Sequence, residues 1–239
     1  MSIRDSGKIV GTVSIKDVAR RCNLQFPLSL RRFRNNTPGC PFARCNTIHI
    51  KVLQQPNIPI DTMLRNMRQV FSTANIRVVV GSRENLGGPA FAALLDVDVG
   101  ACPPPPVPQA TLTAEQTQLF GNNNFVGANE IAVYFVRSVL RNNTEALFGC
   151  AASPANQPSC VVAQTASPWT LAHEVGHVLG LAHIPGENTN CPAGNPNCCS
   201  TPDSTRLMTG CGTNLITGTP TLSQGEINTM NASTLTPTC

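Results

Sequence analysis

The chain has 239 residues, with a formal net charge of +4, 13% charged residues and 41% apolar residues. This length suits one large domain, or one domain with an appendage, and the apolar fraction is sufficient for a core. The mild positive charge lacks the dense basic stripe with interleaved aromatic residues that nucleic-acid binding requires, so we expect no nucleic-acid partner. No run of 18 apolar residues is present, which excludes a membrane-spanning helix.

Eleven cysteines indicate an oxidising compartment. They do not form C-x-x-C pairs at zinc-ribbon spacing, and several lie in loops rich in Pro, Asn and Gly, which is typical of disulfides in secreted proteins. Because eleven is odd, at least one thiol is free or pairs between chains. The first 20 residues lack the apolar core of a signal peptide, so either the signal has been removed or export uses another route.

The first part of the chain predicts an extension followed by a strand–helix–strand unit. Residues 1–45 are basic and weakly patterned, and we interpret them as an N-terminal extension or a propeptide remnant that precedes the main domain, 46–239. Apolar residues alternate over 47–52, recur at helical spacing over 60–73, and form a continuous β-branched run over 76–80. This order favours a right-handed crossover and a partly parallel sheet.

The middle of the chain predicts shorter elements. Residues 113–120 form a helix, with Thr113 as its cap and Gln116 three positions later. The run 103–106 consists of four prolines and predicts a stiff extended linker. Strands are predicted over 94–99, 131–136, 148–153 and 160–164.

A helix that begins near Ser167 carries the residues with the clearest chemistry. Ser167 can cap this helix, and Pro168 suits its first position. Residues 173–183 then read His-Glu-Val-Gly-His-Val-Leu-Gly-Leu-Ala-His. Positions four apart share one face of a helix, about 5–6 Å between Cβ atoms, so His173 and His177 can point to one ion. Imidazole nitrogen is a preferred ligand of zinc.

A catalytic zinc has three protein ligands and leaves one position for water. Gly180 suits the left-handed turn that ends a helix, and such a turn returns His183 to the same ion. Glu174 points beside the ion, where it can act as the general base on the zinc-bound water. A single histidine is usually a satisfied core residue, whereas three of the chain's four histidines lie here at ligand spacing. We interpret the fourth, His49, as an ordinary surface residue on the polar face of a strand.

The segment matches the metzincin signature H-E-x-x-H-x-x-G-x-x-H at every defined position. Over residues 47–239 the chain therefore resembles the metzincin zinc metallopeptidases. Metzincins carry a methionine in a tight turn after the third histidine, and Met208, 25 residues past His183, fits that turn. Met208 would support the zinc site without binding zinc. The family's following helix fits residues 222–232, with Ser223 as the cap, and both a matrixin-like and a pappalysin-like subfamily stay open.

The resemblance implies an α+β fold of the metzincin-like zincin type. Its upper subdomain, up to about residue 180, would hold a twisted mixed sheet and two main helices. Its lower subdomain, 181–239, would be irregular and stapled by disulfides, and would end in a C-terminal helix. The substrate backbone would pair with an edge strand, and our candidates for that strand are Leu147, Phe148, Gly149, Cys150 and Ala151.

The sequence departs from the pattern of some metzincins. Ile184 follows His183 where some subfamilies have Ser or Asp, and a tyrosine is missing near Met208. Some metzincins place a tyrosine just after the turn methionine, where it reaches the zinc or the oxyanion. The only tyrosine of this chain is Tyr134, in a predicted core strand. Zinc and Glu174 would therefore carry that role.

We therefore expect a secreted, monomeric zinc endopeptidase with one catalytic zinc and with protein or peptide substrates. Two alternatives stay open. A non-catalytic, zinc-stabilised binding or toxin-like module would explain the missing tyrosine and the many cysteines. A zinc amidase or deacetylase would need a closed pocket for a small substrate.

Two further interpretations concern the loops. Glu187, Asn188 and Asp203 supply oxygen atoms that suit a calcium ion, although such loops are common without an ion. Cys22, Cys40 or Cys45 could act as a thiol that blocks the zinc in a latent form. We expect Cys40 and Cys45 to form disulfides, which leaves Cys22 as the candidate for an unpaired thiol.

Overall fold

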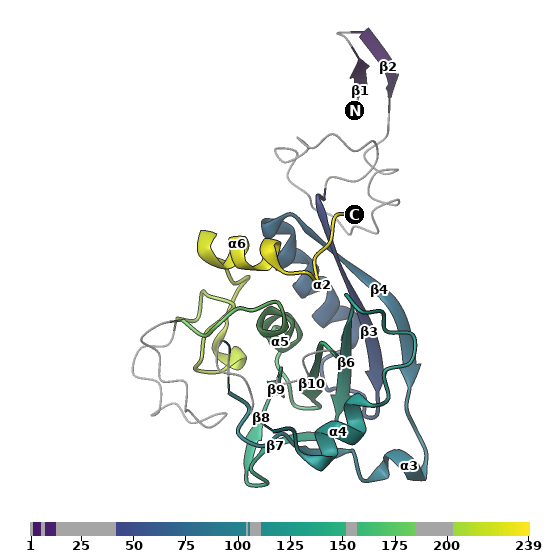
Figure 1. Ribbon diagram of the computed structural model, residues 1–239. Helices are drawn as coiled ribbons and strands as arrows, with labels where there is room; N and C mark the ends of the chain where they lie inside the picture. Colours follow the sequence, from purple (N-terminus) through teal and green to yellow (C-terminus); the bar gives the residue numbers. More distant parts are fainter. Residues whose placement is uncertain are drawn as a thin grey trace.

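The computed structural model describes residues 2–5, 8–12, 42–103, 105, 111–151, 157–184 and 203–239, and a five-stranded mixed sheet organises them (Figure 1). The strand order is β4-β3-β6-β10-β9, in which β9 alone is antiparallel to its neighbour. The predicted mixed sheet is thus confirmed. Its strands are β3 (Arg44–Val52), β4 (Ile76–Asn85), β6 (Ile131–Val136), β9 (Gly149–Cys150) and β10 (Ser159–Ala163).

Two smaller sheets accompany the main one. The order in the three-stranded sheet is β5-β7-β8, and β1 and β2 form an antiparallel hairpin. Their bounds are β1 (Ser2–Asp5), β2 (Lys8–Thr12), β5 (Asp96–Asp98), β7 (Ser138–Arg141) and β8 (Glu145–Leu147). The described helices are α2 (Ile60–Phe71), α3 (Pro89–Ala92), α4 (Ala114–Phe120), α5 (Thr170–Val178) and α6 (Gln224–Ala232), with 3-10 turns η2 (Ser72–Ala74) and η3 (Thr213–Leu215).

The predicted strand–helix–strand unit is confirmed as β3-α2-β4. The helical spacing of apolar residues gives α2 one buried face, which packs on the sheet beside α5. The 3-10 turn η2 follows α2 directly. It ends where Asn75 adopts the left-handed conformation, with φ of 62°, and the chain continues into β4. Strand β3 pairs in parallel with both β4 and β6, so it occupies the centre of the parallel region.

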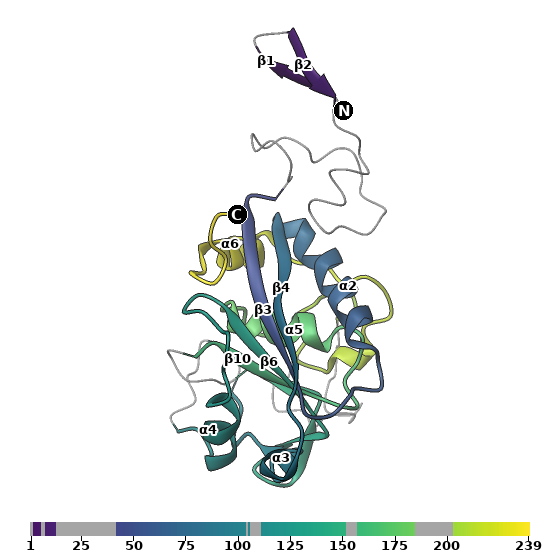
Figure 2. The same cartoon turned by 90° about the vertical axis from the view of Figure 1, so that its right-hand side faces the viewer.

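Helices cover both faces of the sheet, as the two views show (Figure 2). Successive side chains of a strand point to opposite faces. Ile48 and Ile50 of β3 therefore lie in the core that α2 and α5 cover. On the other face, Lys51 is fully buried and its ammonium group bonds to Glu84 and to the carbonyl of Asn124, which lies 2.6 Å away. This second face also carries the core that α4 covers.

The interpretation of His49 as a surface residue is wrong. The residue is only 4% exposed, because a loop and the neighbouring strand cover it. Its Nδ1 lies 2.8 Å from the hydroxyl of Ser82, and its Nε2 lies 2.8 Å from the carboxylate of Glu130. Alternation along the strand placed His49 on the correct face, but it carries no information about the segments that close over that face.

The C-terminal segment returns to the start of β3. A capping box of Ser223 and Glu226 begins α6, which confirms Ser223 as the cap. Beyond α6, the carbonyl of Pro237 accepts a hydrogen bond from the backbone N–H of Cys45, 2.9 Å away. A disulfide then joins Cys45 to Cys239, across 194 positions of the sequence. The predicted disulfide use of Cys45 is therefore confirmed, whereas Cys22 and Cys40 lie outside the described residues.

We predict that replacing both Cys45 and Cys239 by alanine lowers the free energy of unfolding by about 2–5 kcal/mol, because the bond restricts the unfolded chain. Urea unfolding followed by circular dichroism measures this loss. The matched control replaces Cys102 and Cys150, whose bond spans only 48 positions and should contribute less. An unchanged midpoint for the Cys45 and Cys239 variant would contradict the prediction.

Candidate metal centre

Helix α5 positions two of the predicted ligands. It begins at Thr170, with Trp169 as its N-cap. The predicted cap, Ser167, and the predicted first residue, Pro168, are therefore each two residues too early. The hydroxyl of Ser167 accepts a hydrogen bond from the backbone N–H of Trp169 and joins the buried hydroxyls of Thr170 and Thr213. This side-chain cluster shifts the start of the helix, and it ties α5 to the segment that follows Met208.

A Schellman motif ends α5 and turns the chain towards His183. The N–H of Leu181 bonds to the carbonyl of Gly176 at 3.0 Å, and the N–H of Gly180 bonds to that of His177 at 2.9 Å. This pairing requires a left-handed residue just past the helix, and the φ of Gly180 is 97°. Glycine adopts that conformation without the steric cost that a Cβ atom imposes.

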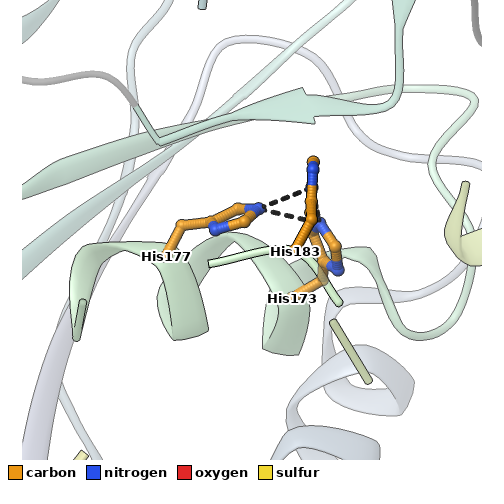
Figure 3. A group of neighbouring side chains, drawn as sticks. All are labelled: His173, His177 and His183. Carbon is orange, nitrogen blue, oxygen red and sulfur yellow. Dashed lines mark hydrogen bonds between the residues drawn. The ribbon is translucent and has the colours of Figure 1, made fainter. Parts of the chain in front are cut away.

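The three histidines converge at the end of this turn (Figure 3). The Nε2 atom of His177 lies 3.0 Å from that of His173 and 3.0 Å from that of His183. The remaining pair, His173 and His183, is separated by 3.4 Å. His173 and His177 are buried, and His183 is partly buried.

Backbone carbonyls fix the orientation of two rings. The Nδ1 atom of His173 lies 2.8 Å from the carbonyl oxygen of Leu207, and that of His177 lies 2.6 Å from the carbonyl oxygen of Leu181. A carbonyl oxygen only accepts, so each Nδ1 carries the proton and each Nε2 presents a lone pair. The ring of His183 packs closely on Gly210, where a Cβ atom would lie 3.2 Å from it.

Burial favours the neutral form of two of these imidazoles. It lowers the pKa of His177 well below the usual range, with further lowering from His173 and His183. Burial also lowers the pKa of His183 to about 3, with further lowering from His173 and Arg141. The neutral imidazole is the form that binds a metal ion.

The geometry of the three nitrogens fits a zinc ion. Neutral lone pairs that face one another repel unless a cation or a proton lies between them. A regular tetrahedron with Zn–N bonds of about 2.0–2.1 Å has edges of about 3.3–3.4 Å. The observed separations of 3.0, 3.0 and 3.4 Å are close to these edges. Among the described residues, no other group of three or more His, Cys, Asp or Glu side chains comes together in this way.

Glu174 is buried beside this cluster. Its burial raises the pKa of the carboxyl group to about 8. The side chain lies against strand β9, where a Cβ atom on Gly149 would be 2.6 Å from the Cγ atom of Glu174. Within the part of the chain that the structure describes, no hydrogen bond to its carboxyl group is found, and the side chain packs against Gly149.

Met208 lies under the helix that carries the histidines. It is fully buried, and its Sδ atom would lie 2.9 Å from a Cβ atom on Gly176. Its carbonyl accepts a hydrogen bond from the N–H of Ile184, next to His183, at 3.1 Å. The preceding residue, Leu207, supplies the carbonyl that orients His173. The turn therefore packs against α5 and fixes the ring of His173 through its backbone.

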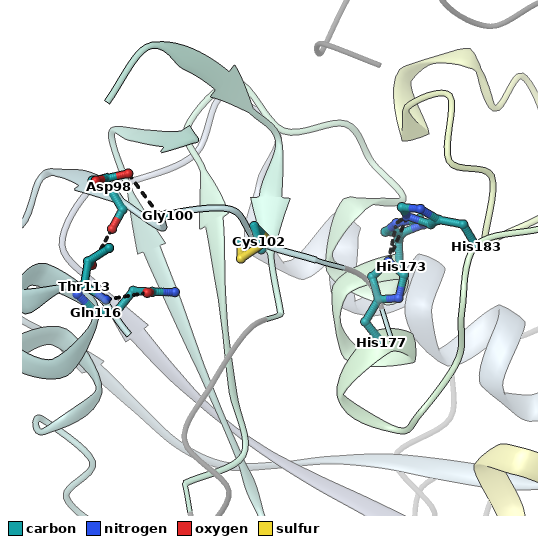
Figure 4. The surroundings of a disulfide bond; sticks show 9 residues. Asp98, Gly100, Cys102, Thr113, Gln116, His173, His177 and His183 are labelled. Carbon is teal, nitrogen blue, oxygen red and sulfur yellow. Dashed lines mark hydrogen bonds between the residues drawn. A yellow bond between two sulfur atoms is a disulfide. The ribbon is translucent and has the colours of Figure 1, made fainter. Parts of the chain in front are cut away.

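The predicted substrate strand is divided between two sheets. Leu147 ends β8, Phe148 lies between the sheets, and Gly149 and Cys150 form β9 at the edge of the main sheet. A disulfide from Cys150 to Cys102 ties this edge to the loop after β5, which lies between the Asp98 turn and the histidines (Figure 4). The edge strand is therefore fixed covalently next to the cluster.

Several other predicted residues lie away from the cluster or outside the described part. Tyr134 is buried in β6, where its hydroxyl donates to the carbonyl of Asn122 at 3.1 Å, and burial raises its pKa. Asp203 bonds to Thr205, whereas Glu187 and Asn188 lie outside the described residues. The calcium proposal is therefore untested, and most of the proline run 103–106 also lies outside the described residues.

The sequence did not reveal why three glycines are needed near the histidines. Gly149, Gly176 and Gly210 each allow a neighbouring side chain to lie against the backbone. A glycine inside a helix costs about 1 kcal/mol relative to alanine, so its presence there indicates a packing reason. Of the three glycines, only Gly176 lies inside a predicted helix, and only it could have been noticed from the sequence. The buried free thiol of Cys160, whose pKa burial raises, was also not singled out.

Comparisons with known proteins give a limited result. No family model matches the chain, and no curated protein matches it. An archaemetzincin from Methanopyrus kandleri is similar to 78% of this chain and 93% of its own, with a TM-score of 0.45 and 12% identity. An archaemetzincin from Archaeoglobus fulgidus, complexed with malonate, is similar to 77% of this chain and 99% of its own, with a TM-score of 0.39 and 14% identity. At these scores the two likenesses do not decide between a matrixin-like and a pappalysin-like subfamily.

We predict that Met208→Ala lowers the free energy of unfolding by about 2–5 kcal/mol and leaves the zinc content unchanged, because Met208 packs without binding the metal. The control Met208→Leu conserves volume and should cost less than about 1.5 kcal/mol. Urea unfolding and metal analysis of the dialysed proteins measure the two effects. Loss of zinc in the leucine variant would show that the sulfur takes part in metal binding.

Proposed function

We propose that this protein is a secreted zinc-dependent endopeptidase that hydrolyses peptide bonds of proteins. The observation that carries the proposal is the convergence of the three Nε2 atoms of His173, His177 and His183. Glu174, the residue after the first histidine, supplies a buried carboxyl group on the same helix. A purely structural zinc site has four protein ligands, whereas three ligands and an adjacent carboxyl group favour catalysis.

The three histidines would hold the zinc ion, and Glu174 would move the proton. When bound, zinc would polarise the substrate carbonyl and lower the pKa of water, which is the chemistry it supplies in such sites. Glu174 would accept a proton from the attacking water and donate it to the leaving amine. Burial raises its pKa to about 8, which supports a carboxyl group that takes up and returns a proton near neutral pH.

Strand β9 would bind the substrate backbone. It is the antiparallel edge of the main sheet, so its outer backbone groups face away from β10. An extended peptide can add to such an edge by main-chain hydrogen bonds, which recognise any sequence. The position of Gly149 against Glu174 supports this choice, because a peptide on β9 would lie beside the carboxyl group.

The disulfides favour an extracellular location. The two described bonds, Cys45–Cys239 and Cys102–Cys150, suit an oxidising compartment. No helix among the described residues is long and apolar enough to span a membrane. We propose that the protein acts as a monomer, with zinc as its resident metal.

A zinc-stabilised binding module is the second candidate. Among the described residues, no tyrosine approaches Met208, since Tyr134 is held in β6 by its bond to Asn122. A module that only binds would retain the zinc cluster and would not need Glu174. The two candidates therefore differ in the effect of changing that one carboxyl group.

We predict that Glu174→Gln lowers kcat for casein hydrolysis by about 10²–10⁴-fold while about one zinc per chain is retained, because glutamine keeps the size of the side chain but cannot accept the proton. Metal analysis and a casein assay on the same zinc-loaded samples measure both quantities. His177→Ala serves as the control and should lose both zinc and activity. Full activity in Glu174→Gln would exclude the base role, and an inactive wild type with bound zinc would favour the binding module.

A further inference from the structure

The place where Glu174 meets strand β9 contains a glycine that the backbone itself does not require. Four described glycines, Gly88, Gly100, Gly180 and Gly212, have a positive φ, and Gly149 is not among them. Any L-residue could therefore adopt the conformation of Gly149. The reason for a glycine at this position must lie in its surroundings.

Those surroundings are the side chain of Glu174. A Cβ atom on Gly149 would lie 2.6 Å from Cγ, 2.7 Å from Oε1 and 2.8 Å from Cδ of Glu174. Separations under 3.0 Å are repulsive, so one of the two groups would have to move. The contact involves the whole end of the side chain, including the carboxyl carbon and one of its oxygens.

Strand β9 is not free to move away. Gly149 and Cys150 pair with Val162 and Val161 of β10, and the N–H of Ala163 bonds to the carbonyl of Phe148 at 2.9 Å. The disulfide between Cys150 and Cys102 anchors the residue that follows Gly149. Helix α5 is equally fixed, because Met208 packs against its Gly176.

Glu174 is therefore the group that would be displaced. It is 6% exposed, and no hydrogen bond within the described residues holds its carboxyl group in place. Packing against Gly149 is thus a principal restraint on where the carboxyl group lies. A displacement of about 1 Å in a reacting group can cost about 100-fold in rate.

We propose that Gly149 is a positioning residue for Glu174: the side chain that it lacks leaves the space in which the carboxyl group lies beside the three histidines. The role rests on the proposed function, in which Glu174 is the general base. Gly149 acts only through the position of Glu174, and it contributes no reacting atom of its own.

The test is a double-mutant cycle between Gly149→Ala and changes at Glu174. In the zinc-loaded wild-type background, Gly149→Ala should lower kcat for a peptide substrate by about 10- to 100-fold, with little change in KM and in zinc content. In the Glu174→Gln background, the same alanine should cause no further loss of kcat, because the two changes act through one group. Gly87→Ala is the matched control, because a Cβ atom there has nothing within 4 Å.

Melting temperature gives a second readout that does not depend on activity. Gly149→Ala should lower the melting temperature of the wild type and should leave that of Glu174→Ala unchanged or raised, because the truncated side chain vacates the space. Equal losses in both backgrounds would overturn the contact, and an unchanged kcat in Gly149→Ala would overturn the positioning role. A zinc-loaded wild type without hydrolysis would instead overturn the proposed function, and the melting-temperature cycle would still decide whether Gly149 sets the place of Glu174.

Discussion

The meeting of the Nε2 atoms of three histidines is the constraint on which the rest of the site depends. Two Nδ1 atoms donate to backbone carbonyls, so the corresponding Nε2 atoms have only lone pairs to present. Bringing these two acceptors to 3.0 Å from each other is unfavourable without a cation. The Schellman turn at Gly180 and the turn at Met208 hold the rings at this distance, because their carbonyls bond to His177 and His173. Zinc binding would then convert an unfavourable arrangement into a stabilising one.

The second feature of the site is the close approach of side chains to glycine residues of the facing backbone. Gly176 lets Met208 lie against α5, and Gly210 lets the ring of His183 lie against the segment after Met208. Gly149 gives the same access to Glu174 from the sheet. Each of these contacts places a functional side chain by excluding a Cβ atom from the facing backbone. The site is therefore packed between helix α5, the turn at Met208 and strand β9.

The sequence predicted those features that depend on local patterns. Apolar spacing predicted α2, alternation predicted β3, and the capping box at Thr113 predicted the start of α4. The ligand spacing placed His173 and His177 on one face, because helix geometry is regular. In contrast, the start of α5 was predicted too early, since the hydroxyl of Ser167 bonds to Thr213, which lies 46 positions away in the chain.

Features that depend on distant contacts could not be read from the sequence. His49 is buried because Ser82 and Glu130 approach it from separate segments, and no local pattern encodes that cover. The close approach of Gly149 to Glu174 likewise depends on how β9 meets α5. Disulfide partners such as Cys45 and Cys239 also become apparent only when the chain ends meet.

X-ray absorption spectroscopy at the zinc edge of the zinc-loaded protein tests the central claim most directly, because the chain offers both histidine and cysteine ligands. The account predicts nitrogen or oxygen neighbours only, at about 2.0–2.1 Å, with the multiple-scattering signal of about three imidazoles. A sulfur neighbour at about 2.3 Å, or the loss of imidazole scattering, would show that the zinc is bound elsewhere and would contradict the account.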